Sequence, residues 1–179
     1  MDASQVFREL GASKAPIDEL RAPSEPGVYA WFLKDGVTLP GFVVPYDRLI
    51  YIGSSSSLAQ RQYETHYSSR QTGFSTVRRT LGALLKEELR LVGRPRGRGT
   101  TPQDFYCYRF EPDGEERLTA WMRNNIRVGV CPNDSYETVE DELISEELPV
   151  LNLKASANPD AREIKRLRKV CADEARARA

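Results

Sequence analysis

Cysteine, histidine and long apolar runs are all scarce in this chain of 179 residues. The three cysteines, an odd number, lack the spacing of metal ligands: Cys107, Cys131 and Cys171. We therefore expect reduced thiols in a cytosol rather than a disulfide framework, and a cytoplasmic location. Because no apolar run approaches the ~20 residues of a membrane helix and no charged-then-apolar leader begins the chain, neither a membrane span nor a signal peptide is expected.

Net charge is also lacking, since 26 basic residues balance 26 acidic ones, so the total charge gives no reason to expect nucleic acid as a partner. The charges are nevertheless segregated along the chain. Residues 61–98 contain nine Lys or Arg and three Glu, whereas residues 104–147 contain twelve Asp or Glu and four Arg. A basic stretch can contact a phosphate backbone; a solvated charged face would show the same pattern.

What the chain does contain is a pair of tyrosine-bearing apolar runs, at residues 26–32 (PGVYAWF) and 49–53 (LIYIG). Both are typical of buried strands. The second ends at a glycine, and a serine run then leads to Ser57, the predicted N-cap of a helix that carries Arg61. Such a strand presents its last side chains at one rim of a sheet, where functional groups are often found. Tyr51 and Arg61 are therefore expected to lie close together.

The rest of the chain alternates further elements. Helices are predicted over 3–10 (ending at Gly11), 75–85, 115–124, from about 135, and from 159 to the end; strands over 105–110 and 126–131; a return to the sheet at 151–153; and a mobile loop over 93–101. This order predicts an α+β fold with a small central, mainly antiparallel sheet flanked by helices, plus an extra C-terminal helix.

These motifs, in this order, resemble the GIY-YIG nuclease superfamily. Residues 27–29 (GVY) and 51–53 (YIG) correspond to the two halves of its name, and 140–144 (EDELI) with 149–152 (PVLN) look like its closing segment. The likeness runs from about residue 26 to 152 and is strongest to a bacterial, mostly single-domain branch. It implies a GIY-YIG-like nuclease domain over 26–153, an N-terminal helix and lead-in over 1–25, and a C-terminal helical extension over 154–179.

The resemblance implies a Mg²⁺-dependent endonuclease that hydrolyses phosphodiester bonds in nucleic acid, with DNA favoured and Mn²⁺ able to substitute. Glu140, three residues before Leu143-Ile144, is the implied metal ligand, and Glu137 and Glu142 are the alternatives. Arg61 would bind the scissile phosphate, because its fork of donors suits phosphate geometry.

The remaining catalytic candidates are Tyr29, Tyr51 and His66. One tyrosine would act as general base, which requires a nearby cation because a free tyrosine titrates near ~10; which of the two it is stays open. In the family a histidine commonly follows the arginine by four residues, but His66 follows Arg61 by five, about 140° around a regular helix. A bulge or the helix end would restore the geometry; otherwise His66 is a surface residue, and Tyr63 could substitute for it.

Asn152 is expected to orient backbone or site groups, and Gly53 to permit close approach of the backbone. Gly53, Arg78 and Arg79 are the candidate substrate contacts, although the two arginines could instead face solvent. Two other functions stay open: a nucleic-acid-binding module that kept the fold but lost cutting, and a protein-interaction domain that uses the acidic helices and the C-terminal helix. The choice between DNA and RNA and the oligomeric state are also open.

Overall fold

The computed structural model describes residues 1–153 and 158–179, so the first residues of the expected C-terminal extension lie outside it. The helices are α1 (Ala3–Ala12), the π-helical η1 (Gln60–His66), the 3₁₀-helical η2 (Thr72–Phe74), α2 (Thr76–Leu84), α3 (Pro102–Tyr106), α4 (Pro112–Asn125), α5 (Tyr136–Glu147) and α6 (Ala161–Ala177). The strands are β1 (Ala15–Pro16), β2 (Gly27–Leu33), β3 (Leu49–Ser55), β4 (Gly93–Arg94), β5 (Arg109–Phe110) and β6 (Ile126–Pro132).

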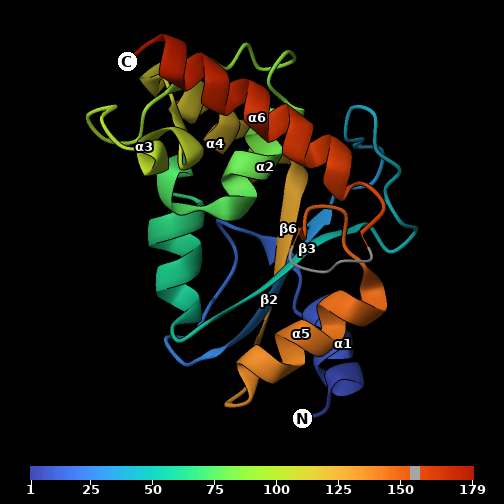
Figure 1. The fold of residues 1–179 in the computed structure, drawn as a ribbon. Helices are drawn as coiled ribbons and strands as arrows, with labels where there is room; N and C mark the ends of the chain where they lie inside the picture. Colours follow the sequence, from blue (N-terminus) through green and yellow to red (C-terminus); the bar gives the residue numbers. More distant parts are fainter. Residues whose placement is uncertain (154–157) are drawn as a thin grey trace.

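The central sheet confirms the predicted fold class. Within the described residues it has four strands in the order β1-β6-β2-β3, and each neighbouring pair is antiparallel. The two tyrosine-bearing runs, β2 and β3, pair directly, with Tyr29 opposite Gly53 and Trp31 opposite Tyr51. Strand β3 is therefore an edge of the sheet. The protein has an α+β fold in which helices flank this sheet (Figure 1).

Alternation along β2 divides the core into two layers, because successive side chains of a strand point to opposite faces. Val28, Ala30 and Phe32 face the apolar sides of α1 and α5, which lie side by side in Figure 1. Tyr29 and Trp31 face the larger core, to which α2, α4 and α6 contribute. Helix α6 packs on α2 and so covers this second layer from outside.

The predicted helix and strand boundaries hold where the apolar pattern is long, and fail in two short segments. Residues 105–110 are not one strand: Thr101 and Asp104 form a capping box that starts α3, and only Arg109–Phe110 form a strand. Residues 93–101 are not a free loop, because β4 pairs with β5 and the backbone N–H groups of Thr100 and Thr101 donate to Asp104 Oδ2.

Two smaller expectations are also corrected. Gly11 does not end α1, which continues to Ala12 and has Ser13 as its C-cap. Residues 151–153 do not form a strand. They run beside β3 instead, where the Leu151 N–H donates to Ile50 O at 2.9 Å.

None of the helices in the described ranges is long and apolar enough to cross a membrane. Cys107, Cys131 and Cys171 are buried free thiols. Besides its apolar core, the part of the chain that the structure describes contains a buried polar network that joins several helices.

That network surrounds Arg78, whose side chain is fully buried on α2. Its guanidinium pairs with Glu115 on α4 at 2.9 Å and also donates to Thr119 Oγ1 at 3.0 Å, Thr72 Oγ1 at 3.2 Å and His66 O at 2.7 Å. Burial lowers the pKa of Arg78, while the Glu115 carboxylate opposes that shift. The guanidinium joins η1, η2, α2 and α4 and has no solvent exposure, so the predicted contact of Arg78 with a phosphate or with solvent is wrong.

We expect Arg78→Met to lower the free energy of unfolding by about 3–5 kcal/mol, because it leaves the Glu115 carboxylate buried without its partner. Urea denaturation measures the change. The matched control is Arg166→Met, which removes an exposed pair with Glu163 and should cost only about 0–1 kcal/mol. Equal losses for the two variants would contradict a special role for the buried pair.

Candidate active site

Two side chains converge on the hydroxyl of Tyr29, which is fully buried on β2. His66 Nε2 lies 2.8 Å from this hydroxyl oxygen, and Arg61 Nε donates to it at 3.4 Å. Tyr51, on the neighbouring strand, packs beside Tyr29 with ring centroids 6.1 Å apart. The structure thus brings together four of the predicted site residues.

The π-helical form of η1 explains how Arg61 and His66 reach the same hydroxyl. In a π-helix the hydrogen bonds run from residue i to residue i+5, so side chains five positions apart lie on one face. The Tyr67 N–H donates to Gln62 O at 2.9 Å in this pattern. The five-residue separation of Arg61 and His66 therefore fits η1, and a regular α-helix would have separated them. Of the alternatives left open by the sequence, the local distortion is the one observed.

His66 is the only histidine in the chain and is fully buried. Its Nδ1 lies 2.8 Å from Ser75 Oγ, the N-cap of α2. Burial lowers its pKa well below the usual value, and the nearby charges of Arg61 and Arg78 lower it further. The imidazole is therefore neutral at neutral pH. Tyr63 does not take its place, since its hydroxyl donates to Leu20 O at 2.8 Å, in the lead-in to the sheet.

The two tyrosines are both protonated in the protein by itself. Burial raises the pKa of Tyr29, although the Arg61 guanidinium and the Tyr51 hydroxyl act in the opposite direction. Burial raises the pKa of Tyr51 further still, helped by Tyr29 and by Glu140. Burial disfavours the charge of Arg61, but the two tyrosines and Glu140 outweigh this effect and raise its pKa. Arg61 alone does not make either phenol a base at neutral pH.

Glu140 approaches the same group from α5, on the far side of β3. Its Oε2 accepts a hydrogen bond of 2.6 Å from Ser54 Oγ, near the end of β3. It is close enough to shift the pKa values of both tyrosines and of Arg61. Val139, Leu143 and Ile144 bury the other side of α5 in the core, which leaves Glu140 half-buried at the sheet edge.

Asn152 and Gly53 shape the backbone of β3. The Asn152 amide accepts from the Ile52 N–H at 2.9 Å and donates to the Ile52 carbonyl at 2.8 Å, so it pairs with the edge strand as a neighbouring strand would. A Cβ on Gly53 would lie 2.5 Å from the Tyr29 ring and hydroxyl and 2.9 Å from the Tyr51 ring. Gly53 therefore leaves the space in which the two tyrosines meet.

Arg79 lies outside this group, as Arg78 does. It is 5% exposed, and its guanidinium donates to Thr72 O, Gly73 O and Thr76 Oγ1. Its donors thus hold η2 against α2, which corrects the expected contact with a phosphate. Two serines, Ser54 and Ser75, also belong to the site, although the sequence pattern indicates only a loop at Ser54 and a helix start at Ser75. Their partners, Glu140 and His66, lie 86 and nine positions away along the chain.

Oxygen donors near Glu140 suit a hard divalent cation. Magnesium typically binds through one or two carboxylates and keeps several waters, and Glu140 with the neighbouring hydroxyls offers such a set. Among residues 1–153 and 158–179, no three His, Cys, Asp or Glu side chains cluster as a metal cage. The residues therefore fit a cation held by one carboxylate and shared with substrate, and do not fit a closed protein site.

The family model described as GIY-YIG catalytic domain matches residues 27–170. The chain belongs to this family. The match includes Tyr29, Tyr51, Arg61 and Glu140 and extends into α6. The protein therefore has a nuclease-type fold, and membership supports a nuclease whose substrate is a nucleic acid. Searches of curated proteins and of solved structures gave no match.

We expect the ring signals of His66 in NMR spectra to stay those of a neutral imidazole from pH 8 to about 5.5, because burial lowers its pKa below ~6.5. The unfolded chain binds the proton more readily than the folded one. The free energy of unfolding is therefore not reduced by this histidine above pH ~6.5, and it falls as the pH drops below that value, by up to about 1.4 kcal/mol per pH unit. His66→Gln should lack this part of the pH dependence in urea titrations. A midpoint near 6.5 in the folded protein would contradict the buried position.

Gly53→Ala should lower the free energy of unfolding by about 1–3 kcal/mol, because the new methyl group forces the packed tyrosine rings apart. Gly11→Ala is the matched control. No atom lies within 4 Å of a Cβ placed there on α1, so alanine should stabilise the protein by roughly 0.5–1 kcal/mol. Chemical denaturation measures both, and a neutral Gly53→Ala would show that the rings are loosely packed.

Proposed function

We propose that this protein is a divalent-metal-dependent endonuclease that hydrolyses phosphodiester bonds in nucleic acid, with Mg²⁺ as the metal and DNA as the favoured substrate. The observation that carries the proposal is the convergence of Arg61 and His66 on the Tyr29 hydroxyl, next to the Glu140 carboxylate. Family membership supports it, because GIY-YIG nucleases are in general divalent-metal dependent.

Tyr29 is our candidate for the general base. The Ser75 hydroxyl can donate to His66 Nδ1, which places the imidazole proton on Nε2, next to the Tyr29 oxygen. Arg61 Nε–H donates to the same oxygen. Two N–H donors would stabilise a phenolate at Tyr29 once its own proton has passed to solvent. The phenolate would then accept a proton from the attacking water. Tyr51 packs alongside and positions the water or the phosphate.

Arg61 has a second task, because its remaining guanidinium donors can bind the oxygens of the scissile phosphate. Glu140 would hold the cation, which when bound supplies the positive charge that lowers the pKa of Tyr29 and neutralises the phosphoryl oxygens. The hydroxide forms a bond to phosphorus, the bond to the leaving oxygen breaks, and that oxygen takes a proton from solvent.

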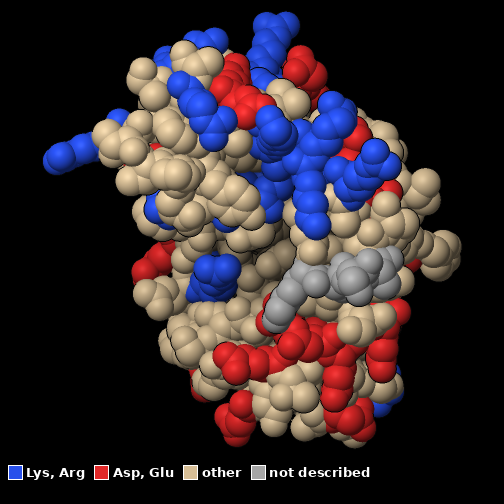
Figure 2. Space-filling view, in the orientation of Figure 1, with Lys and Arg blue, Asp and Glu red and all other residues tan. Residues whose placement is uncertain are grey.

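The inactive binding module is the weaker candidate. The separation of His66 from Arg61 by five residues would favour it, but the π-helical η1 brings both side chains to Tyr29. The zero net charge of the chain would favour it too, but the charges are segregated between different faces of the molecule. Figure 2 shows Lys and Arg gathered over the α6 end of the molecule and Asp and Glu over α5.

The test is cleavage of labelled duplex, branched and single-stranded DNA and RNA with Mg²⁺, Mn²⁺ or EDTA. Glu140→Gln and Arg61→Ala should each reduce the rate by about 100-fold or more, since removing one group that stabilises transition-state charge typically costs about 10²–10³ in rate. Glu146→Gln, an exposed acid on the same helix, is the control and should cut at the wild-type rate.

The alternatives give different results in the same assay. Salt-sensitive binding without metal-dependent cutting by the wild type would favour the inactive module. Absence of binding to every nucleic acid at low salt would favour a protein-interaction domain. Cutting that survives Glu140→Gln would place the metal on another residue, such as Glu137 or Glu142.

A further inference from the structure

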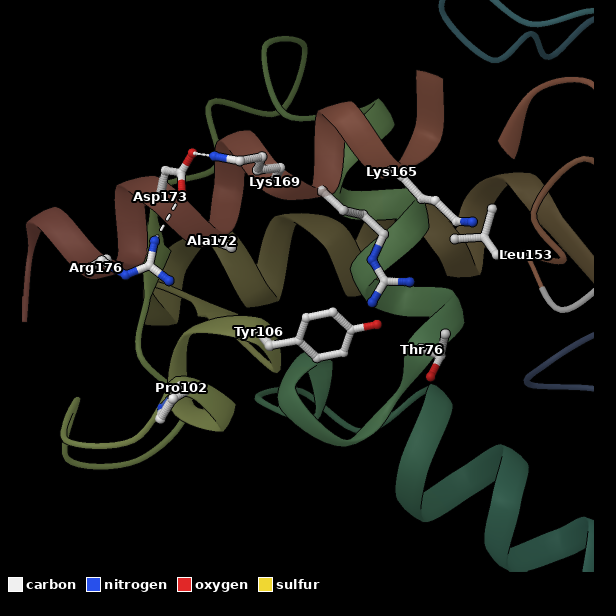
Figure 3. Close-up of a pocket in the computed structure, with 10 residues that line it drawn as sticks. Thr76, Pro102, Tyr106, Leu153, Lys165, Lys169, Ala172, Asp173 and Arg176 are labelled. Atoms are coloured by element: carbon white, nitrogen blue, oxygen red, sulfur yellow. Dashed lines mark hydrogen bonds and ion pairs between the residues drawn. The ribbon is translucent and has the colours of Figure 1, made fainter. Parts of the chain in front are cut away.

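A pocket of about 720 Å³ lies between α6 and α3, over the first residue of α2 (Figure 3). Its lining includes four basic side chains, one acidic side chain and one aromatic ring. The residues that matter here are Thr76, Tyr106, Lys165, Arg168, Lys169 and Arg176. None of them belongs to the group around Tyr29, so the pocket is a separate feature of the surface.

Two of the four basic side chains have no acidic partner among the residues that the structure describes. Lys169 and Arg176 share Asp173, which also lines the pocket. Lys165 and Arg168, in contrast, make no hydrogen bond or ion pair with residues 1–153 or 158–179. Arg168 is 9% exposed, and its neighbour Arg79 has its pKa lowered first by burial and then by the charge of Arg168. Arg168 therefore presents its guanidinium to the pocket beside a second cation, Arg79, and without an acidic partner in the described ranges, an arrangement that favours an anionic ligand.

Tyr106 supplies a second, different feature. Its side chain is 63% exposed, although one face of the ring lies against Arg168, whose guanidinium carbon is 5.6 Å from the ring centroid. In Figure 3 the ring extends from α3 into the pocket, with its hydroxyl toward Thr76. An exposed aromatic ring beside cations is the arrangement on which bases of single-stranded nucleic acids stack.

The exposed Tyr106 ring and the neighbouring cations together favour an unpaired strand over a duplex as the ligand. In a duplex the bases present only their edges in the grooves, so an aromatic side chain cannot stack on their faces. In a single strand each base exposes a face, and each nucleotide carries a phosphate. The pocket volume lies within the ~300–1,000 Å³ of ligand sites, which is room for about one or two nucleotides.

The pocket adjoins the candidate active site along the chain. Thr76 follows Ser75, which bonds to His66, and Leu153 at the pocket wall follows Asn152, which pairs with Ile52. We propose that this pocket binds an unpaired segment of the strand that is cut, with a base stacked on Tyr106 and a phosphate paired with Arg168 and Lys165. This inference rests on the proposed nuclease function, because it assigns part of that substrate.

The test is fluorescence anisotropy with the full chain in EDTA, which prevents cutting. The probes are a labelled thymidine oligonucleotide of about 12 nucleotides, within the roughly 4–16 of comparable sites, and a duplex of the same length. We expect Tyr106→Ala to weaken binding of the single strand about tenfold or more, and Tyr106→Phe, which keeps the ring, to change it by less than about twofold. The duplex should bind more weakly and respond little to either change.

Lys165→Gln tests the pairing with phosphate. The substitution replaces an exposed side chain and leaves the buried Arg168 in place. The slope of log Kd against log salt should fall by about 0.7, because the variant neutralises one phosphate fewer along a single strand. The matched control is Arg162→Gln on the same helix, an exposed residue outside the pocket, which should leave the slope unchanged. Thermal unfolding confirms that all the variants are folded.

Either of two outcomes would overturn the inference: single-strand binding unaffected by Tyr106→Ala, or equal changes in slope for Lys165→Gln and Arg162→Gln. Different results would refute the two proposals. If the wild type cuts, and the Tyr106→Ala variant binds and cuts as the wild type does, only the proposal for the pocket is refuted. A protein that binds through Tyr106 yet never cuts with any metal refutes only the nuclease.

Discussion

The buried ion pair of Arg78 and Glu115 is the constraint on which the geometry of the site depends. A guanidinium without solvent needs every donor directed at an acceptor, because an unpaired buried charge is costly. One donor of Arg78 is directed at the carbonyl of His66, at 2.7 Å. The Arg78 N–H, in turn, donates to Ser75 Oγ, which contacts the His66 ring. The pair therefore holds both the backbone and the ring of the residue that contacts Tyr29.

The site also lies where two differently charged parts of the fold meet. The acidic helix α5 packs on one face of the sheet and supplies Glu140, while η1 on the other face supplies Arg61. A cation and a phosphate need opposite charges around them, and the edge of β3 is where groups from both faces can reach the same point. Ser54 and Tyr51, three positions apart on β3, face toward Glu140 and Tyr29 respectively.

Much of this arrangement could be read from the sequence, because long periodic patterns dominate local structure. The strands around Tyr29 and Tyr51, and the helices of Glu140 and Ile164, followed from apolar spacing. The direction of the His66 side chain could not be predicted from the sequence. It depends on whether the helix is α-helical or π-helical at this point, and tertiary contacts decide between the two forms. The buried state of Arg78 was missed, since its partner Glu115 lies 37 positions away and an arginine at the start of an amphipathic helix is usually exposed.

The predictions for the short segments were wrong for a different reason. Residues 105–110 alternate as a strand does, but the capping box of Thr101 and Asp104 starts a helix there instead. Local hydrogen bonds from side chains can outweigh a pattern of only six residues. The pocket beside Tyr106 could not be seen in sequence either, because α3 and α6 meet there from positions about 60 residues apart.

The pairing of Asn152 with β3 has a consequence for how this molecule meets its own copies. An edge strand offers unpaired N–H and C=O groups to any other extended chain, which is a common origin of aggregation. The Asn152 side chain forms hydrogen bonds with both the N–H and the C=O of Ile52, and the Leu151 N–H donates to the carbonyl of Ile50. At these positions the strand that carries Tyr51 cannot recruit a foreign strand. The candidate active site therefore lies on a sheet edge that is closed to β-augmentation at these positions.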